Sequence, residues 1–135
     1  MTHRRSAALA AALLLFGTGF MAQAATIGAK AFLHAVNTDA DKTISKDELD
    51  AYARKKFAEI EKDNDKTLDA KELKGRLSAR GMASVDTDND KTVDEQEFVG
   101  YADKLFEEAN TKGQKTLSLR ELESSAGKKL IKLLQ

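Results

Sequence analysis

Apolar residues recur at three- and four-residue steps in several short, separate stretches of the chain. Leu49, Tyr52, Ala53, Phe57 and Ile60 form the clearest series, and residues 98–109 repeat it. This spacing places the apolar side chains on one face of an α-helix. Residues 73–85 show the same spacing more weakly, because they contain two glycines. A leading stretch (27–35) and a closing stretch (122–133) complete the set of predicted helices. The pattern predicts five short helices and an all-α fold, a small helical bundle.

Four polar segments of twelve residues connect these helices, and they are repeats of one another. They span 37–48, 61–72, 86–97 and 110–121, and their starts are 24, 25 and 24 residues apart. We call them loops 1 to 4. Each has Lys-Thr at positions 6 and 7, an aliphatic residue at position 8 and Glu at position 12. A repeat of this regularity indicates one structural unit used four times.

The repeated segment has the pattern of the EF-hand ion-binding loop. In that loop, oxygens at positions 1, 3 and 5 face a hard cation, position 7 offers its carbonyl, position 9 a side chain or a water, and Glu at position 12 both its oxygens. The candidate ligands in loop 1 are Asn37, Asp39, Asp41, Thr43, Ser45 and Glu48. Those in loop 2 are Glu61, Asp63, Asp65, Thr67, Asp69 and Glu72. Those in loop 3 are Asp86, Asp88, Asp90, Thr92, Asp94 and Glu97.

The four loops differ in charge. Loops 2 and 3 each offer five carboxylates at ligand positions, although the longer Glu61 fits position 1 less well than Asp86. Loop 1 offers three carboxylates, and loop 4 only Glu121, with Lys112 at position 3. Because affinity in such loops follows ligand charge, we expect two or three bound ions, with loop 3 the strongest site and loop 4 weak or ion-free.

Composition narrows the possible functions. The chain of 135 residues has 22 Lys and Arg against 22 Asp and Glu, which argues against a nucleic-acid binder. Cysteine is absent, which excludes disulfides, thiolate metal sites and a cysteine nucleophile. With 33% charged and 6% aromatic residues the core is thin, so we expect ion binding to contribute to folding.

The first 24 residues have the features of a cleaved secretory signal. Arg4 and Arg5 precede an apolar run over 7–20, and Ala22-Gln23-Ala24 is a small-residue cleavage site. The alternative, a short membrane anchor, is disfavoured because the run is shorter than the ~20 residues that span a bilayer. Cleavage would leave residues 25–135 as one exported domain, without a membrane attachment.

No catalytic motif stands apart from the loops, so the sequence predicts a binding protein and not an enzyme. Every cluster of carboxylates falls at ligand positions of one of the repeated loops. No feature of the sequence identifies a protein partner.

Four loops separated by single short helices, behind an export signal, resemble the lanmodulin family of periplasmic lanthanide-binding proteins. The resemblance extends to the stretch LDAKELKGR at 68–76 and to Ser125-Ala126-Gly127, and it covers the whole chain after the signal. It implies a small helical protein that orders around trivalent lanthanide ions in preference to calcium.

The chain differs from that family at two loop positions. Position 2 is Thr in loops 1, 3 and 4 and Lys in loop 2, where the family has Pro, and position 6 is Lys in every loop, where Gly is usual. The usual loop turn would place Lys66 and Lys91 at positive φ. Two other functions fit the sequence: an exported calcium binder or buffer, and a helical interaction module whose loops are mainly structural.

Overall fold

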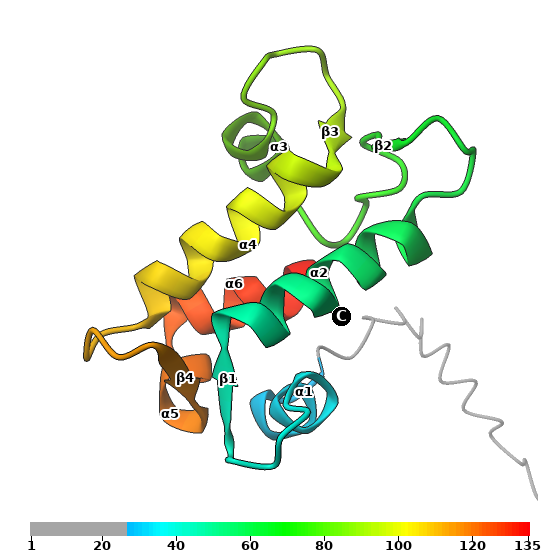
Figure 1. The fold of residues 1–135 in the computed structure, drawn as a ribbon. Coiled ribbons are helices and arrows are strands. Elements are labelled where there is room, and N and C mark those ends of the chain that lie inside the picture. The colour runs from blue at the N-terminus through cyan, green and yellow to red at the C-terminus, as the bar shows by residue number, and fades with distance from the viewer. Residues whose placement is uncertain (1–26) are drawn as a thin grey trace, which may run out of the picture.

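The computed structural model of the chain describes residues 27–135, so the predicted signal peptide lies outside the described residues. Residues 27–135 form six helices and four short strands (Figure 1). Their bounds are α1 Ala29–Val36, β1 Thr43–Ser45, α2 Lys46–Ile60, β2 Thr67–Leu68, α3 Ala79–Val85, β3 Val93–Asp94, α4 Glu95–Ala109, β4 Thr116–Ser118, α5 Leu119–Leu122 and α6 Ser125–Leu134. None of these helices is long and apolar enough to cross a membrane.

The two longest helices, α2 and α4, each begin at position 10 of a loop, and the loop supplies the cap. Ser45 accepts a hydrogen bond from the main chain of Glu48, whose side chain bonds back to the main chain of Ser45. Asp94 and Glu97 make the same reciprocal pair at the start of α4. Such a capping box satisfies N–H groups that the first helical turn leaves without partners. Positions 9 and 12 therefore fix where each helix starts.

The strands pair the loops in a nested order. β1 pairs with β4 and β2 with β3, both antiparallel, so loop 1 lies against loop 4 and loop 2 against loop 3. The position-8 residues face each other across each pair, Ile44 opposite Leu117 and Leu68 opposite Val93, and all four are fully buried. The two small sheets lie at opposite ends of the α2–α4 pair, and these helices run antiparallel because each connects one sheet to the other (Figure 1).

The apolar faces of α2, α4 and α6 form the centre of the core. Helix α4 packs against both α2 and α6, and the rings of Phe57 and Phe98 meet edge to face with centroids 5.8 Å apart. Phe32 of α1 is fully buried and places its ring against Tyr52 at 5.8 Å. The helical periodicity of the sequence therefore corresponds to a shared core on which both sheets rest.

The structure corrects the predicted fold in three places. It is mostly helical but not purely α, because the loops pair as two small sheets. The helix predicted within 73–85 is interrupted: residues 70–76 form turns with Gly75 at φ 83°, and α3 starts only after the cap at Ser78. The single helix predicted for the closing stretch is two helices, α5 and α6. Ser124 caps the start of α6, where its side chain accepts a hydrogen bond from the main chain of Gly127.

Candidate metal centre

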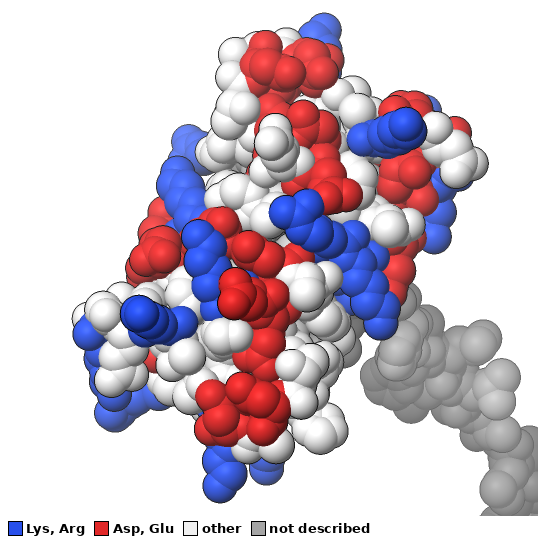
Figure 2. Space-filling model, viewed as in Figure 1, with Lys and Arg blue, Asp and Glu red and all other residues white. Residues whose placement is uncertain are grey.

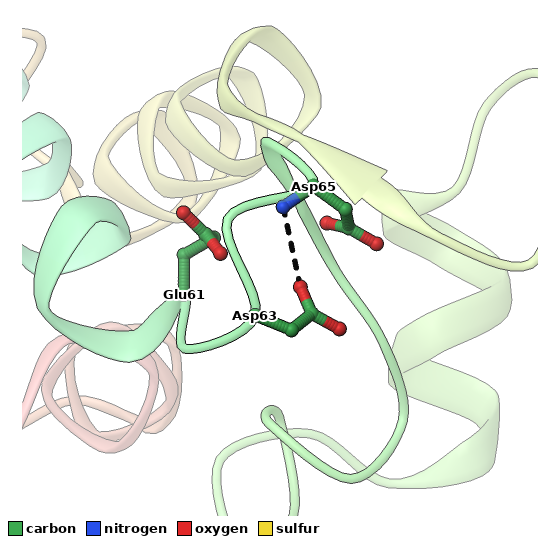
Figure 3. Close-up of side chains that lie close together, drawn as sticks. All are labelled: Glu61, Asp63 and Asp65. Carbon is green, nitrogen blue, oxygen red and sulfur yellow. Dashed lines mark hydrogen bonds between the residues drawn. The ribbon is translucent and has the colours of Figure 1, made fainter.

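Two groups of three carboxylates, one in loop 2 and one in loop 3, can each hold a metal ion. The oxygens of Glu61, Asp63 and Asp65 lie within 4.8 Å of one another, and a second group with the same spacing comprises Asp86, Asp88 and Glu97. Figure 3 shows the loop 2 group along one turn of the chain just after α2, with the main chain of Asp65 donating to Asp63. Because β2 and β3 pair, the two groups belong to hydrogen-bonded loops.

Asp86, at position 1 of loop 3, is held by the backbone of its own loop. Its side chain is only 9% exposed, and its two oxygens accept from the main-chain N–H groups of Asp90 at 3.2 Å and Lys91 at 2.9 Å. Val85, the residue before it, ends α3 and is buried. This end of the loop is therefore anchored in the core.

Glu97, at position 12, closes the same group from the start of α4. One oxygen accepts from the main chain of Thr87 at 2.7 Å and from its hydroxyl at 2.8 Å, and the other accepts from the main chain of Asp94 at 3.1 Å. Burial alone would raise the pKa of Glu97, but the hydrogen bonds from Asp94 and Thr87 outweigh it and lower that pKa. Glu97 is therefore held ionised next to Asp86 and Asp88.

The loop 2 group is built differently. Glu61 accepts from the main chain of Asn64, and Asp63 accepts from Asp65 at 3.3 Å. Glu72 is not part of the group; its oxygens accept from the main chain of Lys62 at 2.6 Å and of Asp69 at 3.1 Å. In loop 2 the group therefore consists of positions 1, 3 and 5, with the longer glutamate side chain at position 1. In loop 3 the group consists of positions 1, 3 and 12.

Repulsion between neighbouring carboxylates is visible in both groups. Burial raises the pKa of Asp63, and the charges of Asp65 and Glu72 add to the effect. A hydrogen bond from the main chain of Asp90 lowers the pKa of Asp88, but burial and the charges of Asp90 and Glu97 outweigh it, and the pKa of Asp88 is raised. A cation between these oxygens would relieve the repulsion.

Several predicted ligands also accept hydrogen bonds from their own loop. At position 5, Asp90 accepts from the main chain and hydroxyl of Thr92, at 2.8 and 2.7 Å, and Asp65 accepts from Thr67 in the same way. At position 9, Asp94 caps α4 and Asp69 accepts from the main chain of Glu72. The structure thus gathers three of the five carboxylates in each loop.

Loop 1 has the predicted residues without a comparable group. Asn37 accepts from the main chain of Asp39 and Ala40, Asp41 accepts from the main chain and hydroxyl of Thr43, and Asp39, Asp41 and Glu48 do not come together within 4.8 Å. Burial alone would raise the pKa of Glu48, but hydrogen bonds from Ser45 and Thr38 lower it to about 2.

Loop 4 also lacks an acidic group, in line with its sequence. Its Glu121 is 4% exposed and accepts from the main chain and hydroxyl of Ser118 at 2.9 and 2.7 Å. Burial would raise the pKa of Glu121, but those bonds and the positive charge of Lys112 lower it. Glu121 therefore acts as a helix cap in the described structure.

Threonine at position 2 has a role that was not predicted from the sequence. In loops 1 and 3 the hydroxyls of Thr38 and Thr87 donate to Glu48 and Glu97 at 2.9 and 2.8 Å, alongside their main-chain N–H groups. Proline at this position could make neither bond. The signal was present in the sequence as a hydroxyl residue ten positions before each glutamate.

No protein-family model matches the chain, and no curated protein matches it either. The assignment of the site therefore rests on the chemistry and geometry of its own residues.

Proposed function

We propose that the chain is a metal-ion-binding protein of the EF-hand type, similar to lanmodulin, whose main sites are loops 2 and 3. One observation carries the proposal: these two paired loops each bring three carboxylates within 4.8 Å of one another. Acidic side chains that bind no metal have no need to lie this close together. Three carboxylates held together repel one another, and a bound cation offsets that repulsion.

The donor set favours a hard cation. All the gathered side chains are carboxylates, and the chain has no cysteine. Oxygen donors select Ca²⁺, Mg²⁺ and similarly hard ions over softer transition metals. Lanthanide(III) ions and Ca²⁺ are therefore the cofactors that we propose.

The charge of the loops favours the trivalent ion. Loops 2 and 3 each have five carboxylates at ligand positions, so a trivalent ion leaves −5 + 3 = −2 and calcium leaves −5 + 2 = −3. The trivalent ion thus removes more repulsion from the same oxygens. Loop 1, with three carboxylates, should discriminate less between the two.

Export to the periplasm and the absence of an enzymatic activity are further parts of the proposal. The first is supported by the signal-like residues 1–24, and the second by the absence of any catalytic motif in the sequence. Coupled ordering and ion binding are supported by the charge repulsion in loops 2 and 3.

Terbium luminescence provides the test. Tyr101 lines the same pocket as Asp88 and Glu97, so its excitation should sensitise terbium in loop 3. We expect Glu97→Gln to weaken terbium binding at this site at least tenfold, because it removes a charged ligand, and Glu121→Gln in loop 4 to change it less than twofold. Equal losses in the two variants would contradict loop 3 as a main site. Displacement of terbium by an equal concentration of calcium would contradict the preference for the trivalent ion.

A further inference from the structure

A second pocket, lined by positive charges, lies between the turn before α3, α3 and α6. It has a volume of about 300 Å³, and four cationic side chains line it: Arg76, Arg80, Lys129 and Lys132. They come from three places in the chain, the turn before α3, α3 itself and α6. No Asp or Glu side chain is among its lining residues.

Among residues 27–135, none of the four cations pairs with an Asp or Glu side chain within 4.0 Å. In residues 27–135, ion pairs within 4.0 Å join other residues, Lys46 to Asp103, Arg54 to Glu95, and Lys55 and Lys56 to Glu59.

Arg76 is the most enclosed of the four. Its guanidinium is half-buried and donates to the main-chain oxygens of Leu133, at 3.2 Å, and Gln135, which fixes it at the end of α6. Burial lowers the pKa of Arg76, while the charge of Glu59 raises it. One cation of the pocket is therefore fixed in place, and the other three are exposed side chains around it.

The shape of the pocket limits the class of ligand. Cations that converge on a small concave site suit a compact anion, whereas a nucleic acid or a membrane surface requires cations spread over an extended face. Arginine forks bind carboxylate and phosphate oxygens through paired hydrogen bonds, and lysines add point charges. A multivalent anion would also reduce the mutual repulsion of the four cations.

We propose that this pocket binds a small multivalent oxyanion, either a phosphate or a polycarboxylate. The site is separate from the metal loops and does not depend on the function proposed for them. Ser84 and Tyr101 nevertheless line both this pocket and the pocket beside loop 3, so the two sites share a wall.

The experiment uses the full-length protein with its metal sites filled by calcium, and free calcium is held constant in excess so that phosphate or citrate does not strip those sites. Phosphate, citrate and acetate are titrated at constant ionic strength while amide shifts of Gly81, Ser84 and Lys132 are followed by NMR. We expect saturable 1:1 binding of phosphate, of citrate or of both, and at least tenfold weaker binding of acetate. Tighter phosphate binding would identify a phosphate site, and tighter citrate binding a polycarboxylate site.

Variants that each remove one positive charge distinguish a specific anion-binding site from general attraction to a basic surface. Arg80→Gln and Lys132→Gln should each weaken anion binding about three- to tenfold, since each removes one direct charge contact. Lys128→Gln is the matched control, because Lys128 lies on the same helix but does not line the pocket, and it should change binding less than twofold. Circular dichroism of each variant checks that the fold is retained. Shifts no larger than those caused by chloride, or an equal loss in Lys128→Gln, would overturn the proposal.

Discussion

Lysine at position 6 takes a backbone conformation that usually belongs to glycine. Lys42, Lys66 and Lys91 have φ of 68°, 67° and 71°, as predicted for Lys66 and Lys91. Position 4 is also at positive φ in these loops, with Ala40, Asn64 and Asn89 in that role. A residue with a Cβ is disfavoured in this region by about 1–2 kcal/mol relative to glycine. Loops 1 to 3 therefore carry backbone strain.

Replacing one of these lysines by glycine should strengthen its loop. The Lys91 side chain has no carboxylate within 4.0 Å among the described residues, so no ion pair opposes the change. After allowing up to ~1 kcal/mol for the added freedom of the unfolded chain, we expect Lys91→Gly to tighten terbium binding at loop 3 about five- to tenfold.

The matched control for this substitution is in loop 4. Lys115 occupies position 6 there but is not at positive φ, and Gly113 at position 4, with φ 62°, makes the turn instead. Lys115→Gly should therefore leave terbium binding unchanged and lower stability slightly. Weaker terbium binding in Lys91→Gly would show instead that the lysine side chain orders the loop.

At the scale of elements, α5 and α6 meet at a contact that admits no side chain. A Cβ on Gly127 would lie 2.4 Å from the main-chain oxygen of Leu122 and 2.5 Å from that of Glu121. Since main-chain atoms cannot move aside easily, Gly127→Ala should reduce the free energy of unfolding by about 1–3 kcal/mol.

Gly100, within α4, provides the opposite case. A Cβ there would meet nothing within 4 Å, so Gly100→Ala should raise the free energy of unfolding by about 0.5–1 kcal/mol through helix propensity. Urea denaturation of both variants checks the contrast. Similar changes in the two would refute the close contact at Gly127.

The interface between α2 and α4 contains a pair of carboxyl groups. One oxygen of Asp50 and one of Asp103 are buried without a hydrogen-bond donor in the described part of the chain, and Lys46 lies 3.2 Å from the other oxygen of Asp103. Burial and the neighbouring Asp103 raise the pKa of Asp50 to about 6. A proton shared by the two groups would supply the missing donor.

This pair should make stability fall as the pH rises. Between the ordinary pKa of Asp, 3.8, and about 6, the folded chain holds a proton on Asp50 that the unfolded chain has lost. Stability from this group is therefore complete below the lower value and lost as the pH rises through about 6.

Asp50→Asn keeps a donor at this position at every pH. In metal-free protein at pH 7.5 it should raise the free energy of unfolding by roughly 1 kcal/mol, a value reduced for the partial exposure of the pair. The gain over the unsubstituted chain should vanish near pH 4, whereas Glu108→Gln, on the exposed face of α4, should show no such trend. A pH-independent difference in thermal unfolding would contradict the shared proton.

At the scale of the whole molecule, local features were predictable and non-local ones were not. Spacing in the sequence revealed the loops and the helices α2 and α4, because each depends on neighbours within a few residues. The nested pairing of the loops could not be predicted from the sequence. Every loop has an aliphatic residue at position 8, so nothing in the sequence distinguishes Leu117 as the partner of Ile44. The structure brings together three of the five predicted carboxylates in each of loops 2 and 3, while Asp90 and Asp94 accept from nearby N–H groups.

Acidic side chains gather at both ends of the molecule. In the view of Figure 2 they cover the two ends where Figure 1 places loop 3 and loop 1, and both acidic and basic side chains lie between these ends. The two acidic groups that can hold a metal ion both lie in the β2–β3 loop pair. We therefore expect the main metal sites at one end of the molecule.

Counting lanthanum ions retained by the protein, by native mass spectrometry after desalting, tests this assignment most directly. The unsubstituted chain should retain at least two ions. Asp86→Asn with Asp88→Asn should lose one, Glu61→Gln with Asp63→Asn should lose another, and the combined variant should lose both. Retention of no ion by the unsubstituted chain, or of equal numbers by the unsubstituted chain and the combined variant, would contradict the account.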